Sequence, residues 1–268
     1  MNLKFSEIYL NSIKNPEEFW KKISDDIFWF KKPTKILNKS NPPFYKWFED
    51  GVTNTCYNAI DVHIEEGKGE KTALIYDSPV TGTKAQFTYN QLKEKVSKFA
   101  GALDNKGIKK GDRVIIYMPM IPEAVVAMLA CGRIGAIHSV VFGGFASNEL
   151  ASRIDDSKAK ILITASCGFE PGRTVEYRPL VDGALKLAKH KVDKVIFFQR
   201  KGHQVNLNAP LEISWDEVLV NAKDKDCVEM GSNEFAYILY TSGTTGVPKG
   251  IVRDIGGHIV ALKWTMKN

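Results

Sequence analysis

The sequence has no long uninterrupted apolar run and no closely paired cysteines. Each absence argues against a particular class of protein. The most apolar stretch, residues 124–143, is interrupted by Arg133 and His138, so we interpret it as a helix, a turn and a strand rather than a membrane span. Residues 1–14 lack the continuous apolar core of a secretion signal. Because none of the four cysteines belongs to a Cys-x-x-Cys pair, their spacing indicates neither a zinc site nor a disulfide framework.

The chain also lacks a run of charge of one sign. Its 37 Lys and Arg residues exceed its 31 Asp and Glu residues by 6, and the basic residues occur as scattered pairs, which is typical of solvated faces. We therefore expect no nucleic-acid partner and no membrane partner. The cysteine usage fits a reducing compartment, so the expected location is cytoplasmic. A mild positive balance suits polyanionic small ligands, although it identifies none.

Aromatic residues, by contrast, are concentrated in the first 60 residues, where Asn41-Pro42-Pro43 interrupts them. We interpret this segment as an extension whose aromatic side chains pack onto a larger body. With 268 residues, 44% of them hydrophobic, the chain can bury a sizeable core. We predict two parts, an extension over 1–60 and a larger, incomplete domain over 61–268.

From about residue 73 the hydrophobic pattern predicts alternating strands and helices. A hairpin is expected over 73–89, and Thr88 and Gln91 have the spacing of a capping box that starts a helix ending near Gly107. Further strands are expected at 114–118, 138–142, 161–164, 195–198 and 236–240, and further helices at 122–129, 148–154 and 180–188. The alternation predicts an α/β fold, a mostly parallel sheet with helices on both faces. Ligands of such sheets bind at the carboxyl ends of strands, so the glycine-rich turns after 138–142 and 236–240 are candidate sites.

The strongest local feature is the glycine-rich segment Tyr240-Thr241-Ser242-Gly243-Thr244-Thr245-Gly246-Val247-Pro248-Lys249-Gly250. Its glycines let the backbone approach an anion closely, its hydroxyls can donate to phosphate oxygens, and Lys249 adds a positive charge. A Walker A loop requires Gly-Lys-Ser/Thr opening a helix, whereas here 248–250 lacks that order and 251–253 reads as a strand. The segment therefore predicts a phosphate-binding loop of another kind. The alternative is a surface loop that is merely rich in Gly and Thr.

The pattern Thr-Ser-Gly-Thr-Thr-Gly-x-Pro-Lys-Gly resembles the phosphate-loop signature of the adenylate-forming, AMP-forming acyl-CoA synthetase family. Residues 54–59, 112–124 and 128–145 resemble the short-chain members, so the resemblance covers nearly the whole chain from about Phe19. Three segments look most like the propionyl-CoA synthetase branch rather than the acetyl branch. These are residues 77–83, residues 165–173, and residues 252–254 together with 256–258.

The resemblance implies the large domain of an adenylate-forming synthetase and a two-step ligase reaction. A small carboxylate, propionate or acetate, attacks the α-phosphorus of ATP and gives acyl-AMP and pyrophosphate. The thiol of coenzyme A then displaces AMP and gives the thioester. ATP and coenzyme A are thus the expected ligands, and Mg²⁺ is expected to accompany ATP. We assign no catalytic residue and no metal ligand within this chain, because the attacking carboxylate is already ionised.

The resemblance also assigns residues to two binding functions. Those expected to bind the ATP phosphates are Thr241, Ser242, Gly243, Thr244, Thr245, Gly246 and Lys249. Those expected to contact coenzyme A are Phe142, Gly143, Gly144, Glu170, Pro171, Gly172 and Arg173. In acetyl-CoA synthetases the segment matching 170–173 has an arginine at each end. Here Glu170 takes the first place, and Arg173 is the candidate for a CoA phosphate.

Each of these assignments has a plainer alternative. Gly143 and Gly144 could form only a tight turn, and Arg173 could be an ordinary surface arginine. We interpret His138, which follows an apolar run, as a packed core histidine, and His258 as a helix-cap residue.

The later motifs of the family are not found in these 268 residues, and the sequence stops within a helical pattern at 259–264. We therefore expect an amino-terminal fragment without the carboxyl-terminal domain, inactive alone and able to associate through exposed apolar surface. One alternative is an acetyl-CoA or other short-chain synthetase fragment. Two others are a split enzyme and a non-catalytic nucleotide- or CoA-binding remnant.

Overall fold

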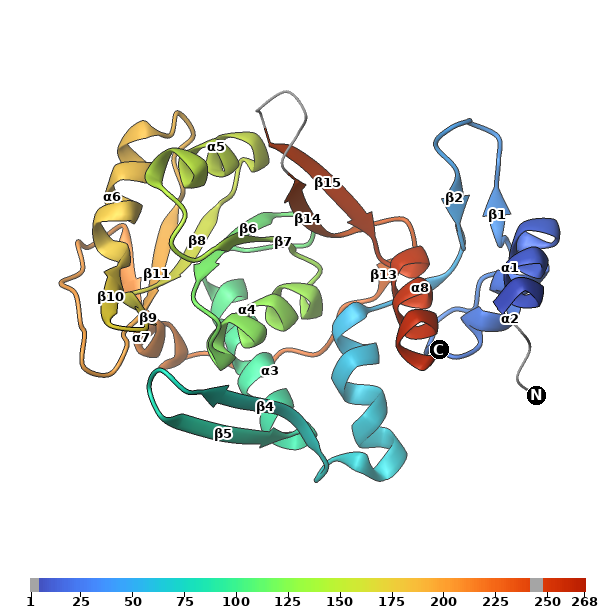
Figure 1. Cartoon of the computed structure of the whole chain (residues 1–268), viewed down its shortest axis with the longest axis horizontal. Helices are drawn as coiled ribbons and strands as arrows, with labels where there is room; N and C mark the ends of the chain where they lie inside the picture. The colour runs from blue at the N-terminus through green and yellow to red at the C-terminus, as the bar shows by residue number, and fades with distance from the viewer. Residues whose placement is uncertain (1–4, 242–247) are drawn as a thin grey trace.

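The computed structural model describes residues 5–241 and 248–268. Its centre is a seven-stranded sheet in the order β12-β11-β8-β6-β7-β14-β15 (Figure 1), parallel throughout except that β14 and β15 are antiparallel. Its strands are β6 (Arg113–Met118), β7 (Ile137–Phe142), β8 (Ile161–Ala165), β11 (Lys194–Phe198), β12 (Glu212–Ser214), β14 (Phe235–Thr241) and β15 (Lys249–Asp254). The α/β fold predicted from the sequence alternation is confirmed.

Helices cover both faces of this sheet, α3 with α4 on one and α5 with α6 on the other (Figure 1). Their bounds are α3 (Tyr89–Asn105), α4 (Pro122–Arg133), α5 (Ser147–Ser157) and α6 (Tyr177–Leu187). The predicted capping box is present, since the Gln91 N–H donates to Thr88 Oγ1 at 3.3 Å and the Thr88 N–H donates to Gln91 Oε1 at 2.9 Å. Gly107, with φ of 86°, ends α3 as expected.

The main core lies between the sheet and these helices. Val114, Ile115, Ile116 and Tyr117 of the central strand β6 are all fully buried, so both faces of the strand are covered. This explains why the run is continuously apolar rather than alternating. Each such side chain contributes roughly 1.5–3 kcal/mol by leaving water.

A second, smaller core joins the amino-terminal segment to the end of the chain. Its buried side chains include Trp29 and Phe48 from the first part and Ile255, Ile259 and Val260 from the region of α8 (Gly256–Lys267). The amino-terminal elements are α1 (Phe5–Lys14), α2 (Pro16–Ser24), β1 (Leu37–Asn38), β2 (Lys46–Trp47), β3 (Val52–Thr53) and the π-helical turns η1 (Tyr57–Asp61) and η2 (Ile64–Lys68). Several aromatic side chains of the first 60 residues, among them Trp29 and Phe48, therefore pack against a larger body as expected. Phe5, Tyr9, Phe44 and Tyr45 do not, since they are exposed.

Several elements differ from the sequence expectation. The helix predicted to end at Leu129 continues to Arg133, because the buried Arg133 is ion-paired and does not mark a solvent-exposed end. The remaining elements are the predicted hairpin β4 (Thr72–Ser78) and β5 (Thr83–Thr88), and the unpredicted β9 (Cys167–Glu170), β10 (Arg173–Glu176), α7 (Trp215–Leu219) and β13 (Met230–Gly231). Among the described residues, no helix has both the length and the apolar character needed to cross a membrane.

Candidate functional site

The two glycine-rich turns singled out in the sequence follow strands that are neighbours in the sheet. Tyr237 of β14 pairs in parallel with His138 of β7, so both strands end at the same edge. Thr241 at the end of β14 lies opposite Lys249 at the start of β15. The structure thus brings together the two ends of the predicted phosphate loop. The other predicted phosphate-binding residues, Ser242, Gly243, Thr244, Thr245 and Gly246, lie outside the described residues.

Both glycines after β7 are required by local geometry. A Cβ added to Gly143 would lie 2.1 Å from the Tyr177 hydroxyl oxygen and 2.9 Å from the Met118 carbonyl oxygen. Gly144 has φ of +97°, a backbone conformation that side chains disfavour. The exposed ring of Phe142 lies 5.5 Å from that of Phe145, measured between centroids. The two glycines therefore form a tight turn, and their contact with a ligand stays a prediction.

Two buried tyrosines hold this turn in place. The Tyr117 hydroxyl donates to the Phe145 carbonyl oxygen at 2.7 Å, and the Tyr117 and Tyr177 rings stack with centroids 4.9 Å apart. Burial raises the pKa of Tyr117 to about 12, so the hydroxyl stays a neutral donor. Tyr177 also approaches Gly168, where an added Cβ would lie 3.1 Å from its hydroxyl oxygen. The tyrosine pair thus connects the turn after β7 to the base of the β9–β10 hairpin.

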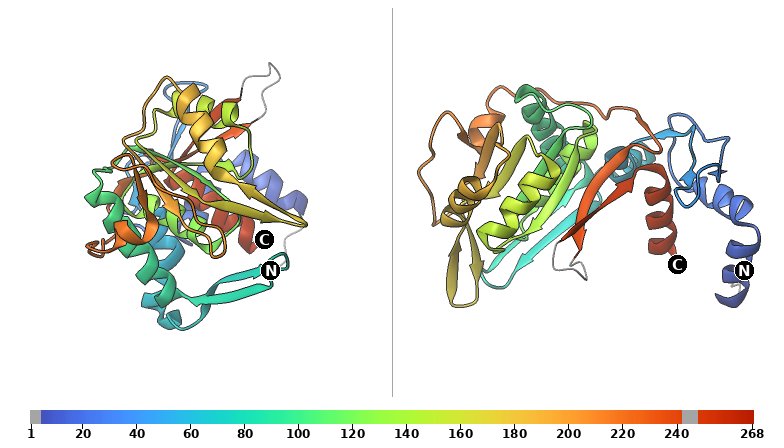
Figure 2. Two further views of the ribbon diagram at one scale, coloured as in Figure 1. Left: turned by 90° about the vertical axis from the view of Figure 1, so that its left-hand side faces the viewer. Right: turned by 90° about the horizontal axis from the view of Figure 1, so that it is seen from above.

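Four of the residues predicted to contact coenzyme A, 170–173, form the tip of that hairpin, which projects from the body of the molecule (Figure 2). Pro171 and Gly172, whose φ is +75°, make the turn, and Glu170 pairs with Arg173 across it. The Arg173 Nε donates to Glu170 Oε2 at 2.7 Å, and the two side chains are 71% and 44% exposed. An ion pair so exposed contributes roughly 0.2–1 kcal/mol, so Arg173 can exchange Glu170 for a stronger anion.

An arginine that the sequence reading did not single out lies between the two candidate turns. Arg153 of α5 stacks over the Phe145 ring at 5.3 Å and over the Tyr240 ring at 5.2 Å. Its Nη1 pairs with Glu149 Oε2 at 2.7 Å. The Tyr240 hydroxyl donates to Asp156 at 2.6 Å, so α5 fixes the end of β14 against the turn after β7. Nothing local in the sequence identifies this contact.

A second overlooked cation, Arg200, follows β11 at the same edge of the sheet. Its guanidinium lies 4.9 Å from the Phe169 ring centroid, and its backbone N–H donates to Ser166 Oγ at 2.8 Å. Arg200 therefore supports the base of the β9–β10 hairpin. The rule that ligands bind at the carboxyl ends of parallel strands would have indicated it.

The two histidines discussed from the sequence are connected through Tyr237. The His138 ring stacks on the Tyr237 ring at 5.5 Å, and the Tyr237 hydroxyl is 2.7 Å from His258 Nε2. His138 is packed as expected, and burial lowers its pKa to about 4. The helix-cap interpretation of His258 is wrong, because α8 begins after Ile255 and the His258 ring is engaged by Tyr237 instead.

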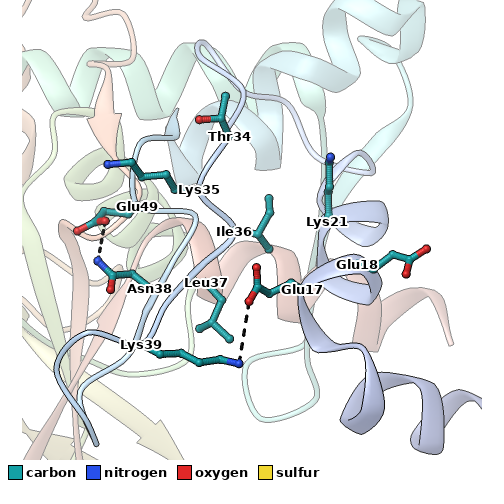
Figure 3. A pocket seen from close by; sticks show the side chains of 10 residues that line it. All are labelled: Glu17, Glu18, Lys21, Thr34, Lys35, Ile36, Leu37, Asn38, Lys39 and Glu49. Atoms are coloured by element: carbon teal, nitrogen blue, oxygen red, sulfur yellow. Dashed lines mark hydrogen bonds and ion pairs between the residues drawn. The ribbon is translucent and has the colours of Figure 1, made fainter.

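Two hollows lie away from this edge. One of about 610 Å³ is bounded by α2 and the loop around β1 (Figure 3) and is lined by both lysines and glutamates. Lys39 there faces Glu17 at 4.0 Å and Asn38 donates to Glu49 at 2.9 Å, so its charges are largely matched internally. The other, of about 280 Å³, is lined by Trp20, Trp47, Phe48, Arg253, Asp254, Gly257, His258 and Ala261.

Comparisons with known proteins agree with this arrangement. Residues 62–267 match the family model described as AMP-binding enzyme, and residues 5–59 match the acetyl-coenzyme A synthetase N-terminus. A solved structure of acetoacetyl-CoA synthetase from Streptomyces lividans superposes with a TM-score of 0.88 at 23% identity, covering 99% of this chain and 40% of that one. At that identity the superposition supports the fold alone.

Curated relatives match over almost the whole of this chain. The Homo sapiens acyl-CoA synthetase short-chain family member 3, mitochondrial, is 55% identical over 258 residues, which are 96% of this chain and 38% of the relative. An acetyl-coenzyme A synthetase of Xylella fastidiosa is 43% identical, covering 97% of this chain and 41% of the relative. A propionate–CoA ligase of Escherichia coli is 42% identical, covering 98% and 42%. The chain thus spans about two fifths of the length of these relatives.

Proposed function

Because the chain belongs to the AMP-binding enzyme family, we propose that the protein is an AMP-forming, short-chain acyl-CoA synthetase. In this proposal ATP and a small carboxylate give acyl-AMP and pyrophosphate, and coenzyme A then gives the thioester. Mg²⁺ enters only as the counter-ion of ATP, and we assign no residue of this chain to it.

The observation that supports the proposal is the meeting of β7 and β14 at one edge of the sheet. Thr241 and Lys249 lie opposite each other where the antiparallel pair β14–β15 opens. In the first step negative charge grows on the departing pyrophosphate. A hydroxyl and an ammonium group held there in advance stabilise that charge, together with the donors of residues 242–246.

For the second step, the proposed CoA site runs from the turn after β7 to the tip of the β9–β10 hairpin. At Gly144 the turn carries no side chain, which leaves backbone open to the pantetheine arm, whereas the side of Gly143 that would carry a Cβ faces the buried Tyr177 hydroxyl. Arg173 would meet a CoA phosphate at the exposed tip by exchanging its bond to Glu170 for a bond to the phosphate. A phosphate carries more charge than a carboxylate and forms a stronger charge-assisted pair.

For the carboxylate we propose propionate, on the resemblance of three segments to the propionyl branch. Acetate is the competing substrate, because the relatives named for acetate and for propionate are similarly identical to this chain, at 43% and 42%. One methylene group changes the binding free energy by about 1–3 kcal/mol, so the expected preference is roughly 10- to 200-fold.

The test is carboxylate-dependent exchange of labelled pyrophosphate into ATP by the protein isolated from its source. We expect exchange with propionate to exceed exchange with acetate, and Lys249→Ala to lower it at least about tenfold. Lys84→Ala, which removes an exposed lysine of β5 that is ion-paired with Asp77 at 2.8 Å, is the matched control and should leave exchange unchanged. A preference for acetate would refute the substrate alone. No exchange with either carboxylate would refute the synthetase proposal.

The CoA assignment has its own readout. Arg173→Ala should raise the KM for coenzyme A without changing pyrophosphate exchange, and Glu170→Gln should lower that KM because it removes the competing carboxylate. If neither variant changes this KM, the hairpin tip does not bind coenzyme A.

The division into an extension over 1–60 and a larger domain over 61–268, and a cytoplasmic location, are part of the same proposal. The name of the Homo sapiens relative specifies mitochondria, so the location requires its own experiment. Fractionation of source cells with an antibody to the amino-terminal segment distinguishes the two compartments.

A further inference from the structure

A buried cluster far from the candidate edge gathers residues from three distant segments. Cys56 precedes η1, Asp61 ends it, Arg133 ends α4, and Cys227 lies in the irregular stretch before β13. Cys56, Asp61 and Cys227 each place one potential metal-ligand atom, a sulfur or a carboxylate oxygen, within 4.8 Å of the other two. The sequence spacing gave no sign of this grouping, because the two cysteines are 227 − 56 = 171 positions apart.

The guanidinium of Arg133 occupies the centre of this cluster. Its Nη1 lies 2.7 Å from Asp61 Oδ2, 3.1 Å from Cys227 Sγ and 3.6 Å from Cys56 Sγ. The Arg133 side chain is 1% exposed, so it cannot move into solvent. A fixed positive charge in contact with all three potential ligands opposes the binding of a metal cation, so the cluster requires another interpretation.

The charges of the cluster favour one thiolate. Arg133 and Lys93, whose Nζ lies 2.9 Å from Asp61 Oδ1, supply two positive charges against one carboxylate. Burial by itself raises the pKa of the Cys56 thiol, but the hydrogen bond from Cys227 and the charge of Arg133 bring that pKa below its ordinary value. The Cys227 sulfur lies within 4.8 Å of the Cys56 sulfur and 3.7 Å from Asp61 Oδ2. Its hydrogen bond to Cys56 and its burial raise the pKa of the Cys227 thiol, so Cys227 keeps the remaining proton.

We propose that Cys56 and Cys227 form a redox-active dithiol that a hydroperoxide oxidises to an intramolecular disulfide. Cys227 is partly exposed, whereas Cys56 is fully buried, so the oxidant reaches the pair at Cys227. At rest Cys227 holds the proton, so the Cys56 thiolate takes up that proton as the Cys227 sulfur attacks the oxidant. Cys131 contrasts with Cys56, since burial without a nearby cation raises the pKa of the Cys131 thiol to about 12.

The chemistry balances with hydrogen peroxide as the oxidant. The Cys227 sulfur attacks one peroxide oxygen and passes its proton to the Cys56 thiolate. The O–O bond breaks, and the departing hydroxide takes up a proton from solvent to give water, which leaves a sulfenic acid on Cys227. The second thiol then attacks the sulfenic sulfur, the S–O bond breaks, and a second water leaves. Two thiols and one peroxide thus give one disulfide and two waters. The new bond links the segment before η1 to the stretch that leads into β13 and β14.

The test is peptide mapping of the native protein after a brief exposure to hydrogen peroxide, quenching with catalase, and alkylation in denaturant. We expect a Cys56–Cys227 linked peptide that dithiothreitol removes, while Cys131 and Cys167 remain alkylated. Protein oxidised in denaturant should lose this selectivity, because the folded cluster brings the sulfurs together. Full alkylation of Cys56 and Cys227, a link from Cys56 to Cys131, or sulfinic acid on Cys227 with Cys56 free would each overturn the proposal.

Two cysteine variants test whether the disulfide is specific to this cluster. Cys227→Ser should abolish the linked peptide, whereas Cys167→Ser, which removes another buried thiol outside the cluster, should leave its yield unchanged. This outcome is independent of carboxylate-dependent pyrophosphate exchange, so either proposal can fail without the other.

Discussion

The packing around Gly143 leads to a prediction that can be worked out atom by atom. An alanine Cβ at this position would lie 2.1 Å from the Tyr177 hydroxyl oxygen, whereas ordinary contact begins near 3.4 Å, so the hydroxyl would have to move by 3.4 − 2.1 = 1.3 Å. Tyr177 is only 2% exposed and is stacked on Tyr117, so it has little room to move. Overpacking of this kind costs about 1–3 kcal/mol.

For a chain of this size we expect Gly143→Ala to lower the melting temperature by roughly 2–12 °C, at about 2–4 °C per kcal/mol. Adding Tyr177→Phe removes the nearest atom and should restore most of the loss. The Met118 carbonyl oxygen, at 2.9 Å, accounts for the remainder because backbone cannot rotate away. The assay is thermal unfolding of the wild type, both single variants and the double variant.

Gly144→Ala is the matched control for this cycle. No atom of residues 5–241 or 248–268 lies within 4 Å of its added Cβ, but its φ of +97° carries a strain of about 1–2 kcal/mol. Tyr177→Phe should therefore not rescue it. If Tyr177→Phe rescues both glycine variants equally, or rescues neither, the steric explanation for Gly143 is refuted.

Three further predictions concern the rest of the fold. Asp61→Ala leaves Arg133 buried without its partner and should cost about 3–5 kcal/mol in urea unfolding, whereas the exposed Asp77→Ala should cost almost nothing; similar values would contradict the buried-pair argument. His138 has a folded pKa of about 4, below the value near 6.5 of an unfolded histidine, so the unfolded state binds its proton first as the pH falls. Stability should drop by about 1–2 kcal/mol between pH 7 and pH 5, and an unchanged slope in His138→Gln would show that another group is responsible. Gly101→Ala places a Cβ 1.7 Å from the Lys223 carbonyl oxygen and should lower the unfolding free energy by about 2–3 kcal/mol, with a loss below 1 kcal/mol counting against a rigid contact.

Sequence patterns predicted the sheet because its strands are buried on both faces. A central parallel strand such as β6 needs apolar residues at every position, and the run from Val114 to Tyr117 cannot be solvated on either side. Turn and cap residues then fixed the ends of elements, as at Thr88 and Gly107. The β9–β10 hairpin was not predicted, because its four-residue strands contain Gly168 and exposed charged side chains at the tip.

Some residues of the candidate site could likewise be predicted from the sequence, and others could not. Residues whose role depends on backbone shape, such as Gly143 and Gly144, are visible in the sequence because only glycine fits those positions. Arg153 and Arg200 act by stacking on rings that the fold brings to them, and no local pattern records such a contact. The same reasoning applies to Glu170 and Arg173, whose ion pair exists only because a two-residue turn places them opposite each other.

The Cys56–Cys227 cluster is the clearest example of a feature that the structure reveals and the sequence alone does not. Arg133 and Asp61 are 72 positions apart, and in the sequence each reads as an ordinary surface charge. Because both side chains are buried, an unpaired Arg133 guanidinium in that core would destabilise the fold far more than the ion pair does. That same fixed positive charge, and not the cysteine spacing, distinguishes the Cys56 thiol, whose pKa is lowered, from the inert Cys131. Cys227→Ser therefore tests whether the thiol beside that buried charge is the partner of Cys56.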